Sequence, residues 1–129
     1  MGVAIIYRDE RADGKVLFEH SLEFSFGFVT VRQLIEARVE SEMDVRTNIK
    51  PANYLVTPVQ AEIILNGDRK ESAKRVDVNE QKRIALASFQ ANGFFMFINS
   101  RQLTDLDEVV GLEPDARVSF VKLVPLVGG

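Results

Sequence analysis

The chain has 129 residues, of which 46% are hydrophobic and 27% are charged, and its formal net charge is −3. This length is enough for one domain with a buried core, and the absence of a basic patch argues against nucleic acid and anionic membranes as partners. There is no cysteine, which excludes disulfides, thiolate metal sites and a thiol nucleophile.

The beginning of the chain gives no targeting signal. No apolar run is long enough to cross a bilayer. The first residues also lack the basic region and long apolar region of a signal peptide. We therefore expect a cytoplasmic protein.

The first 26 residues predict a β-hairpin. Residues 3–7 are a short apolar run of strand formers, and Asp13-Gly14 is a turn signal. Residues 16–26 then alternate between apolar and polar side chains, which indicates a strand with one buried face. The side chains predicted to face inward are Val16, Phe18, His20, Leu22, Phe24 and Phe26.

Helix start signals follow the hairpin. Thr30 and Gln33 have the spacing of a capping box and predict a helix over 31–43. Residues 44–56 form a polar connector. Thr57-Pro58-Val59-Gln60 then predicts a short helix over 58–65, because proline is favoured at the first helical position.

A third helix is predicted between Asp77 and Asn92. Asp77 is the expected N-cap, and Asn92-Gly93 is the expected stop. At helical spacing, its inner face would hold five residues: Gln81, Ile84, Ala85, Ser88 and Phe89.

Two strands and a helical turn are predicted after the third helix. Residues 94–98 are the most hydrophobic run and predict a central strand, which residues 101–103 continue after a tight turn. We expect one helical turn over 104–110, with Leu106 and Val109 facing inward.

The last strand is predicted over 118–124, at the opposite end of the chain from the first. One helix between the hairpin and the later strands allows the first and last strands to pair in parallel with a right-handed crossover. We therefore predict a single α+β domain over 1–124, in which a mixed sheet of four to five strands is packed by a helix. The segment from about 44 to 92 would be a helical insertion.

The residues after this strand are the candidate functional site. Pro125 has no N–H to donate and ends the ladder, and Leu126 and Val127 lead to Gly128-Gly129. A diglycine is slender enough to thread a narrow channel, which suits a tail whose terminal carboxylate reacts. A frayed terminus with small residues is the simpler alternative.

The order of elements, with this ending, resembles the ubiquitin-like β-grasp fold. Residues 94–129 are similar to the last third of the ThiS/MoaD sulfur carriers. Those carriers have a strand ending in Asn, a Leu-Asp pair, a turn before the final strand, a proline and a terminal Gly-Gly. The larger domain with a bare Gly-Gly is more similar to the ubiquitin-like modifiers of bacterial conjugation systems.

This resemblance implies a chain that supplies an acyl group and is not itself an enzyme. A partner enzyme, with ATP and Mg²⁺, would adenylate the carboxylate of Gly129. A conjugating enzyme would then pass the chain to a target lysine, and a deconjugating protease could reverse this. Gly128 would keep the partner's channel passable, and Pro125, Leu126 and Val127 would hold the tail extended in a groove. We expect no cofactor or metal in the chain itself.

Two other functions remain open. The chain could be a sulfur carrier that ends in a thiocarboxylate, or a β-grasp subunit that binds without a covalent step and whose glycines are incidental. Lys15, Lys70, Lys74 and Lys82 are conceivable acceptors if the modifier forms chains.

Other features are weaker candidates for function. His20 is more consistent with a core position than with a ligand or base. The acidic residues Asp105, Asp107 and Glu108 are more typical of capping and solvated charge than of a metal site. An apolar patch on the exposed sheet face is expected to draw on Leu17, Met96 and Val121.

Overall fold

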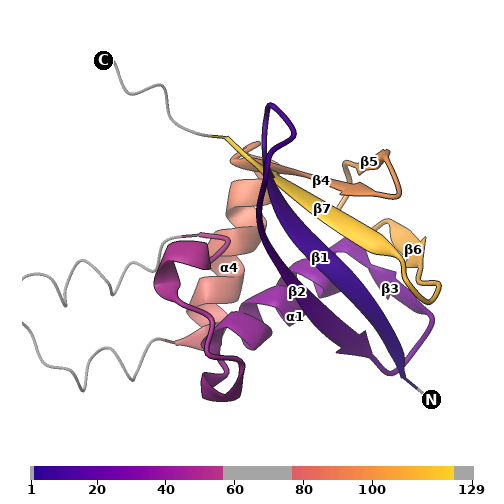
Figure 1. The fold of residues 1–129 in the computed structure, drawn as a ribbon, viewed down its shortest axis with the longest axis horizontal. Helices are drawn as coiled ribbons and strands as arrows, with labels where there is room; N and C mark the ends of the chain where they lie inside the picture. The colour runs from indigo at the N-terminus through magenta and orange to yellow at the C-terminus, as the bar shows by residue number, and fades with distance from the viewer. Residues whose placement is uncertain (1, 57–76, 124–129) are drawn as a thin grey trace, which may run out of the picture.

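The computed structural model describes residues 2–56 and 77–123 (Figure 1). In that part of the chain the fold is α+β, with a mixed five-stranded sheet and two helices. The strands of this sheet are β1 (Val3–Arg11), β2 (Val16–Phe24), β4 (Phe94–Ile98), β5 (Arg101–Leu103) and β7 (Arg117–Lys122). The prediction of an α+β domain with a mixed sheet is confirmed.

The strand order is β2-β1-β7-β4-β5, so the first and last strands are neighbours at the centre of the sheet. β1 and β7 run parallel, with Ile6 opposite Arg117 and Arg11 opposite Lys122. The β1–β2, β4–β7 and β4–β5 pairs are antiparallel. Figure 1 shows β1 and β7 side by side, with β2 beyond β1 and β4 beyond β7.

Helix α1 (Val31–Met43) has the bounds that the capping box predicts. The Thr30 side chain accepts a hydrogen bond from the Gln33 amide at 3.1 Å. The Gln33 side chain in turn accepts one from the Thr30 amide at 2.8 Å. Two short 3₁₀ turns, η1 (Val45–Thr47) and η2 (Pro51–Asn53), follow in the connector that the sequence indicates only as polar.

Helix α4 (Val78–Gln90) confirms the third predicted helix and its cap at Asp77. It ends where Asn92 adopts a left-handed conformation with φ of 63°. The Gly93 amide there donates to the Ser88 carbonyl at 2.7 Å, and the Asn92 amide donates to the Phe89 carbonyl at 3.1 Å. The short helix predicted over 58–65 lies outside the described residues.

The core lies between the helices and one face of the sheet. Figure 1 shows α1 and α4 on the same side of the strands. Strand alternation places the buried side chains of that face at every second position. They include Ile5 and Tyr7 of β1, Phe94, Met96 and Ile98 of β4, and Val118 and Phe120 of β7. No described helix has the length and apolarity needed to cross a membrane.

A two-stranded sheet was not predicted. It pairs β3 (Phe28–Thr30) with β6 (Val109–Gly111), which lie about 80 residues apart in the sequence. The helical turn expected over 104–110 is wrong, because a turn from Asp105 to Glu108 leads directly into β6. Strand alternation then buries Val110 and leaves Val109, which was expected to face inward, 62% exposed.

Three expected positions of apolar side chains also need correction. Val16, predicted to face inward, is 42% exposed, because the register of β1 and β2 shifts between Asp9 and Glu10 and pairs Val16 with Glu10. β2 ends at Phe24, so Phe26 is not on the buried face and is 74% exposed. Met96 is fully buried under the helices and cannot belong to an exposed sheet patch. Its neighbours Phe95 and Phe97, both half-buried, are on the uncovered face instead.

Candidate functional site

The predicted site residues Pro125, Leu126, Val127, Gly128 and Gly129 lie outside the described residues. The structure describes β7, which ends at Lys122, and Leu123 after it. The side chains beneath the end of β7 are therefore the part of the candidate site that the structure positions.

Lys122, the last residue of β7, joins this strand to two other segments. Its ammonium donates to the Tyr54 carbonyl at 2.9 Å and lies 3.2 Å from a carboxylate oxygen of Asp9. Tyr54 follows η2, and Asp9 lies on β1. The end of β7 is thus held by both the neighbouring strand and the connector after α1.

Asp9 belongs to a buried charged network with Arg38 and Glu42. The guanidinium of Arg38 donates to both carboxylate oxygens of Asp9, with an Nη2–Oδ2 distance of 2.7 Å. Its Nε donates to Glu42 Oε2 at 2.8 Å. The exposed fractions of Asp9, Arg38 and Glu42 are 1%, 0% and 2%. Charges buried this completely require such pairing, because desolvation alone would be prohibitive.

Aromatic rings enclose the guanidinium of Arg38. Its Cζ atom lies 4.5 Å from the centroid of the Tyr7 ring and 4.6 Å from that of Phe120. Cations gain electrostatic attraction from ring faces at this distance, most of all when water is excluded. The rings and carboxylates together fix the guanidinium between α1 and the two central strands.

The pKa values in the network follow from burial and charge. Burial raises the pKa of the Glu42 carboxyl, against the opposing effect of the Arg38 charge. For Arg38, burial lowers the pKa, but the hydrogen bond and charge of Asp9 together with the charge of Glu42 raise it, and the net shift is upward. Burial also raises the pKa of the Tyr7 phenol, although Arg38 opposes this. The guanidinium is therefore permanently charged, and Glu42 retains its proton to a higher pH than an exposed glutamate.

The network also fixes the connector after α1. Arg38 Nη2 donates to the Asn53 carbonyl at 3.1 Å, and the Leu55 amide donates to Glu42 Oε2 at 2.7 Å. Together with the Lys122–Tyr54 bond, these contacts hold residues 53–55 against α1 and the end of β7. The arrangement therefore holds the end of β7 in place.

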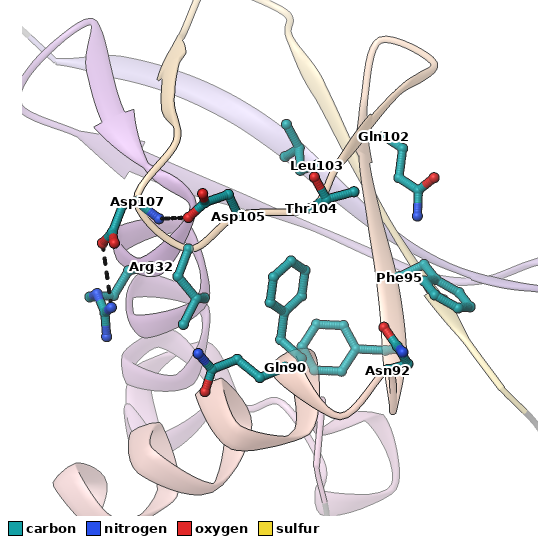
Figure 2. Close-up of a pocket in the computed structure, with 12 residues that line it drawn as sticks. Arg32, Gln90, Asn92, Phe95, Gln102, Leu103, Thr104, Asp105 and Asp107 are labelled. Atoms are coloured by element: carbon teal, nitrogen blue, oxygen red, sulfur yellow. Dashed lines mark hydrogen bonds and ion pairs between the residues drawn. The ribbon is translucent and has the colours of Figure 1, made fainter.

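A separate pocket of about 360 Å³ lies at the β5 edge of the sheet (Figure 2). It is formed by the end of α4, the beginning of β4, β5 with the turn after it, and the first turn of α1. Its lining combines the aromatic rings of Phe89, Phe94 and Phe95 with the polar side chains of Arg32, Gln90, Asn92, Gln102, Thr104, Asp105 and Asp107.

The weaker sequence candidates have ordinary structural positions. The His20 ring stacks on Phe18 with centroids 6.2 Å apart, on the inner face of β2. Lys82 forms an ion pair with Glu40, and Lys15 closes the turn of the first hairpin through its backbone amide. Lys70 and Lys74 lie outside the described residues. Across residues 2–56 and 77–123, no three acidic or histidine side chains are grouped to hold a metal ion.

Sequence reasoning missed the buried network entirely. The signal was present in the spacing of α1, because Val31, Ile35, Arg38 and Glu42 recur at intervals of four, three and four residues. This spacing places both charged residues on the apolar stripe. Asp9 likewise follows Ile5 and Tyr7 at alternate positions of β1.

Comparisons of the chain with protein-family models, with curated proteins and with solved structures gave no match.

Proposed function

We propose that this chain is a ubiquitin-like protein modifier with a β-grasp fold, conjugated to other proteins through the carboxylate of Gly129. The observation that carries the proposal is the strand order β2-β1-β7-β4-β5 with β1 parallel to β7. In a β-grasp domain, an N-terminal hairpin is followed by a helix, and the last strand pairs in parallel with the first. This chain has that order of elements, and Pro125, Leu126, Val127, Gly128 and Gly129 follow β7 within a few residues.

The buried network supports this proposal through the base of the tail. β7 is hydrogen-bonded on both sides, to β1 and β4, and Lys122 ties its end to the connector. A tail that must enter a partner's active site gains from a rigid starting point, because less orientational freedom is lost on binding.

The proposed chemistry is acyl transfer in two stages. A partner enzyme joins the Gly129 carboxylate to the AMP part of ATP and releases pyrophosphate. A nucleophile, first a partner's cysteine thiolate and finally a lysine amine, then attacks the carbonyl carbon and displaces AMP or the thiolate. The product is an amide bond between Gly129 and the target, and Gly128 allows the tail to pass the partner's channel.

The decisive experiment compares the full chain with a variant lacking Gly129, each expressed with an N-terminal tag in its native host. Both proteins are examined on denaturing, reducing gels and by intact mass, and their thermal unfolding is compared so that a folding defect is recognised. We expect a ladder of heavier, thiol-resistant species with the full chain and none with the variant.

Two other results would assign a different function to the chain. A single species in which sulfur replaces one oxygen at the terminus would identify a sulfur carrier. Identical gels and masses for the two proteins would eliminate both covalent functions and leave a non-covalent binding subunit.

A further inference from the structure

The pocket at the β5 edge has no part in the proposed acyl transfer, although its lining residues Phe94 and Phe95 lie opposite Lys122 and Val121 at the end of β7. It opens at the edge strand of the sheet, whereas the tail continues from the central strand β7. Figure 2 shows Asp105, Thr104 and Gln102 on one side of it and Gln90 and Asn92 on the other. Its volume of about 360 Å³ is near the lower end for small-ligand sites and is suited to a single large side chain.

The segment that runs past this pocket is rich in carboxylates, although Arg101 before it forms an ion pair with Glu108. Residues 104–116 contain five carboxylates and no lysine, arginine or histidine: Asp105, Asp107, Glu108, Glu113 and Asp115. The Asp107 side chain is 82% exposed, and its ion pair with Arg32 is long, at 3.4 Å. Asp105 accepts the Asp107 amide through one oxygen at 2.8 Å. The pocket lining therefore carries two carboxylates against one guanidinium.

An exposed apolar patch adjoins the acidic segment. Val109 follows Glu108 directly and is 62% exposed, and Phe28 on the paired strand β3 is 71% exposed. The β3–β6 pair is attached to the segment that lines the pocket, since the amides of Val31 and Arg32 donate to the carbonyls of Glu108 and Leu106. The pocket and the patch therefore share the continuous segment 104–111. We call this combined surface, made of the pocket, residues 104–111 and Phe28, the acidic face.

We propose that the acidic face binds a basic, partly apolar segment of a partner protein and takes one arginine side chain into the pocket. A guanidinium matches the lining because it can lie over the half-buried ring of Phe95 while it donates to carboxylate and amide oxygens. A metal ion fits less well, because the described residues contain no group of three suitable ligands. Apolar side chains next to the arginine would cover Phe28 and Val109.

The experiment uses the full chain, uniformly labelled with ¹⁵N, and a defined probe. The probe is a synthetic, end-blocked decapeptide in which arginine and leucine alternate, and its control is the same peptide with each arginine replaced by citrulline. Citrulline keeps the shape of the side chain but has no charge. We expect the arginine peptide to shift the amide signals of residues 104–111 and 28–30. The affinity of the citrulline peptide should be lower by about tenfold or more.

Matched variants distinguish a specific binding site from general electrostatic attraction to an acidic protein. In Asp105→Asn/Asp107→Asn both charges are removed, while the side-chain carbonyl oxygen introduced at position 105 can still accept the residue-107 amide, so the turn is retained. Glu19→Gln and Glu23→Gln together also remove two charges, and both residues lie on β2 at the opposite edge of the sheet. We expect the first pair to weaken binding about fivefold or more and the second to change it less than about twofold.

Three results would overturn the proposal. They are equal binding of the two peptides, equal loss of affinity in the two double variants, or signal shifts that map away from the acidic face. Phe28→Ser/Val109→Thr provides a second approach, because these exposed changes leave the carboxylates in place. The proposal requires that this variant also weakens binding of the arginine peptide.

Discussion

Arg38 and Asp9 lie 29 residues apart and form a fully buried ion pair in which the guanidinium donates to both carboxylate oxygens. The pair joins α1 to the central strand β1, and the Tyr7 and Phe120 rings enclose it. A two-point contact of this kind fixes the orientation of the helix as well as its distance from the sheet.

Removal of Arg38 should strongly destabilise the fold. Arg38→Met keeps an unbranched apolar side chain between the rings but leaves the Asp9 and Glu42 carboxylates buried, with Lys122 as the remaining cation beside Asp9. Loss of one member of a buried ion pair costs about 3–5 kcal/mol of unfolding free energy. Urea denaturation measures the change, and the exposed Arg83→Met serves as the control, with an expected effect below about 0.5 kcal/mol.

Simultaneous removal of the partner charge tests the origin of that cost. In Arg38→Met/Asp9→Leu no uncompensated charge remains from the pair, so the double variant should lose less stability than the sum of the two single variants. Additive losses would mean that the two residues act independently, contrary to their contact.

The burial of Glu42 predicts a specific dependence of stability on pH. The pKa of Glu42 is raised by burial above its ordinary value of 4.5. Between the ordinary and the raised pKa, the folded state binds more protons than the unfolded state, so the free energy of unfolding falls as the pH rises. Glu42→Gln removes this titration.

The stability advantage of the wild-type chain over Glu42→Gln should therefore be greatest below pH 4.5 and shrink as the pH rises through the folded-state pKa. Urea denaturation of both proteins over a series of pH values measures this difference. The pKa assignment is wrong if the advantage of the wild-type chain increases across the same interval.

Local signals in the sequence explain which elements were predicted. α1 was predicted to the residue because Thr30 and Gln33 cap it through contacts within one turn. α4 was predicted because Asp77 and Asn92-Gly93 mark its ends in the same local way. The two-stranded sheet was missed because Phe28 and Gly111 are separated in sequence by both described helices and two strands, and neither three-residue strand has a periodic pattern of its own.

One part of the candidate functional site could be proposed from the sequence and another part could not. The Gly-Gly tail could be proposed from the sequence, since its chemistry resides in a few consecutive residues. The buried network could not be seen in composition, because charged residues are expected to face water unless a partner elsewhere in the chain compensates them. Only the arrangement of β1 against α1 brings Asp9 to Arg38.

The capping box of α1 makes a contribution that can be measured directly. Thr30→Ala removes the hydroxyl that accepts the Gln33 amide and should lower the unfolding free energy by about 1 kcal/mol. Thr30→Ser retains an acceptor at the same position and should recover most of that loss. Thermal unfolding of the three proteins provides the comparison, and a serine variant as unstable as the alanine variant would contradict this function of the hydroxyl.

Gly93 is required by the close approach of the chain to Ser88 at the end of α4. A Cβ atom at residue 93 would overlap the Ser88 hydroxyl oxygen and would lie 3.1 Å from the Ser88 carbonyl oxygen. Gly93→Ala must therefore move the serine side chain and strain the helix end, and it should cost about 1 kcal/mol or more. Gly27→Ala is the matched control, because its Cβ would meet nothing closer than the Leu112 carbonyl oxygen at 3.8 Å.

A double-mutant cycle separates the contribution of the Ser88 hydroxyl to this cost from that of the Ser88 carbonyl. In a Ser88→Ala background the closest clash is gone and the 3.1 Å approach to the carbonyl remains, so Gly93→Ala should cost less there than in the wild-type chain. Urea denaturation of the four proteins of this cycle gives the coupling free energy. An equal cost in both backgrounds would place the strain in the backbone contact, since the hydroxyl would then contribute nothing.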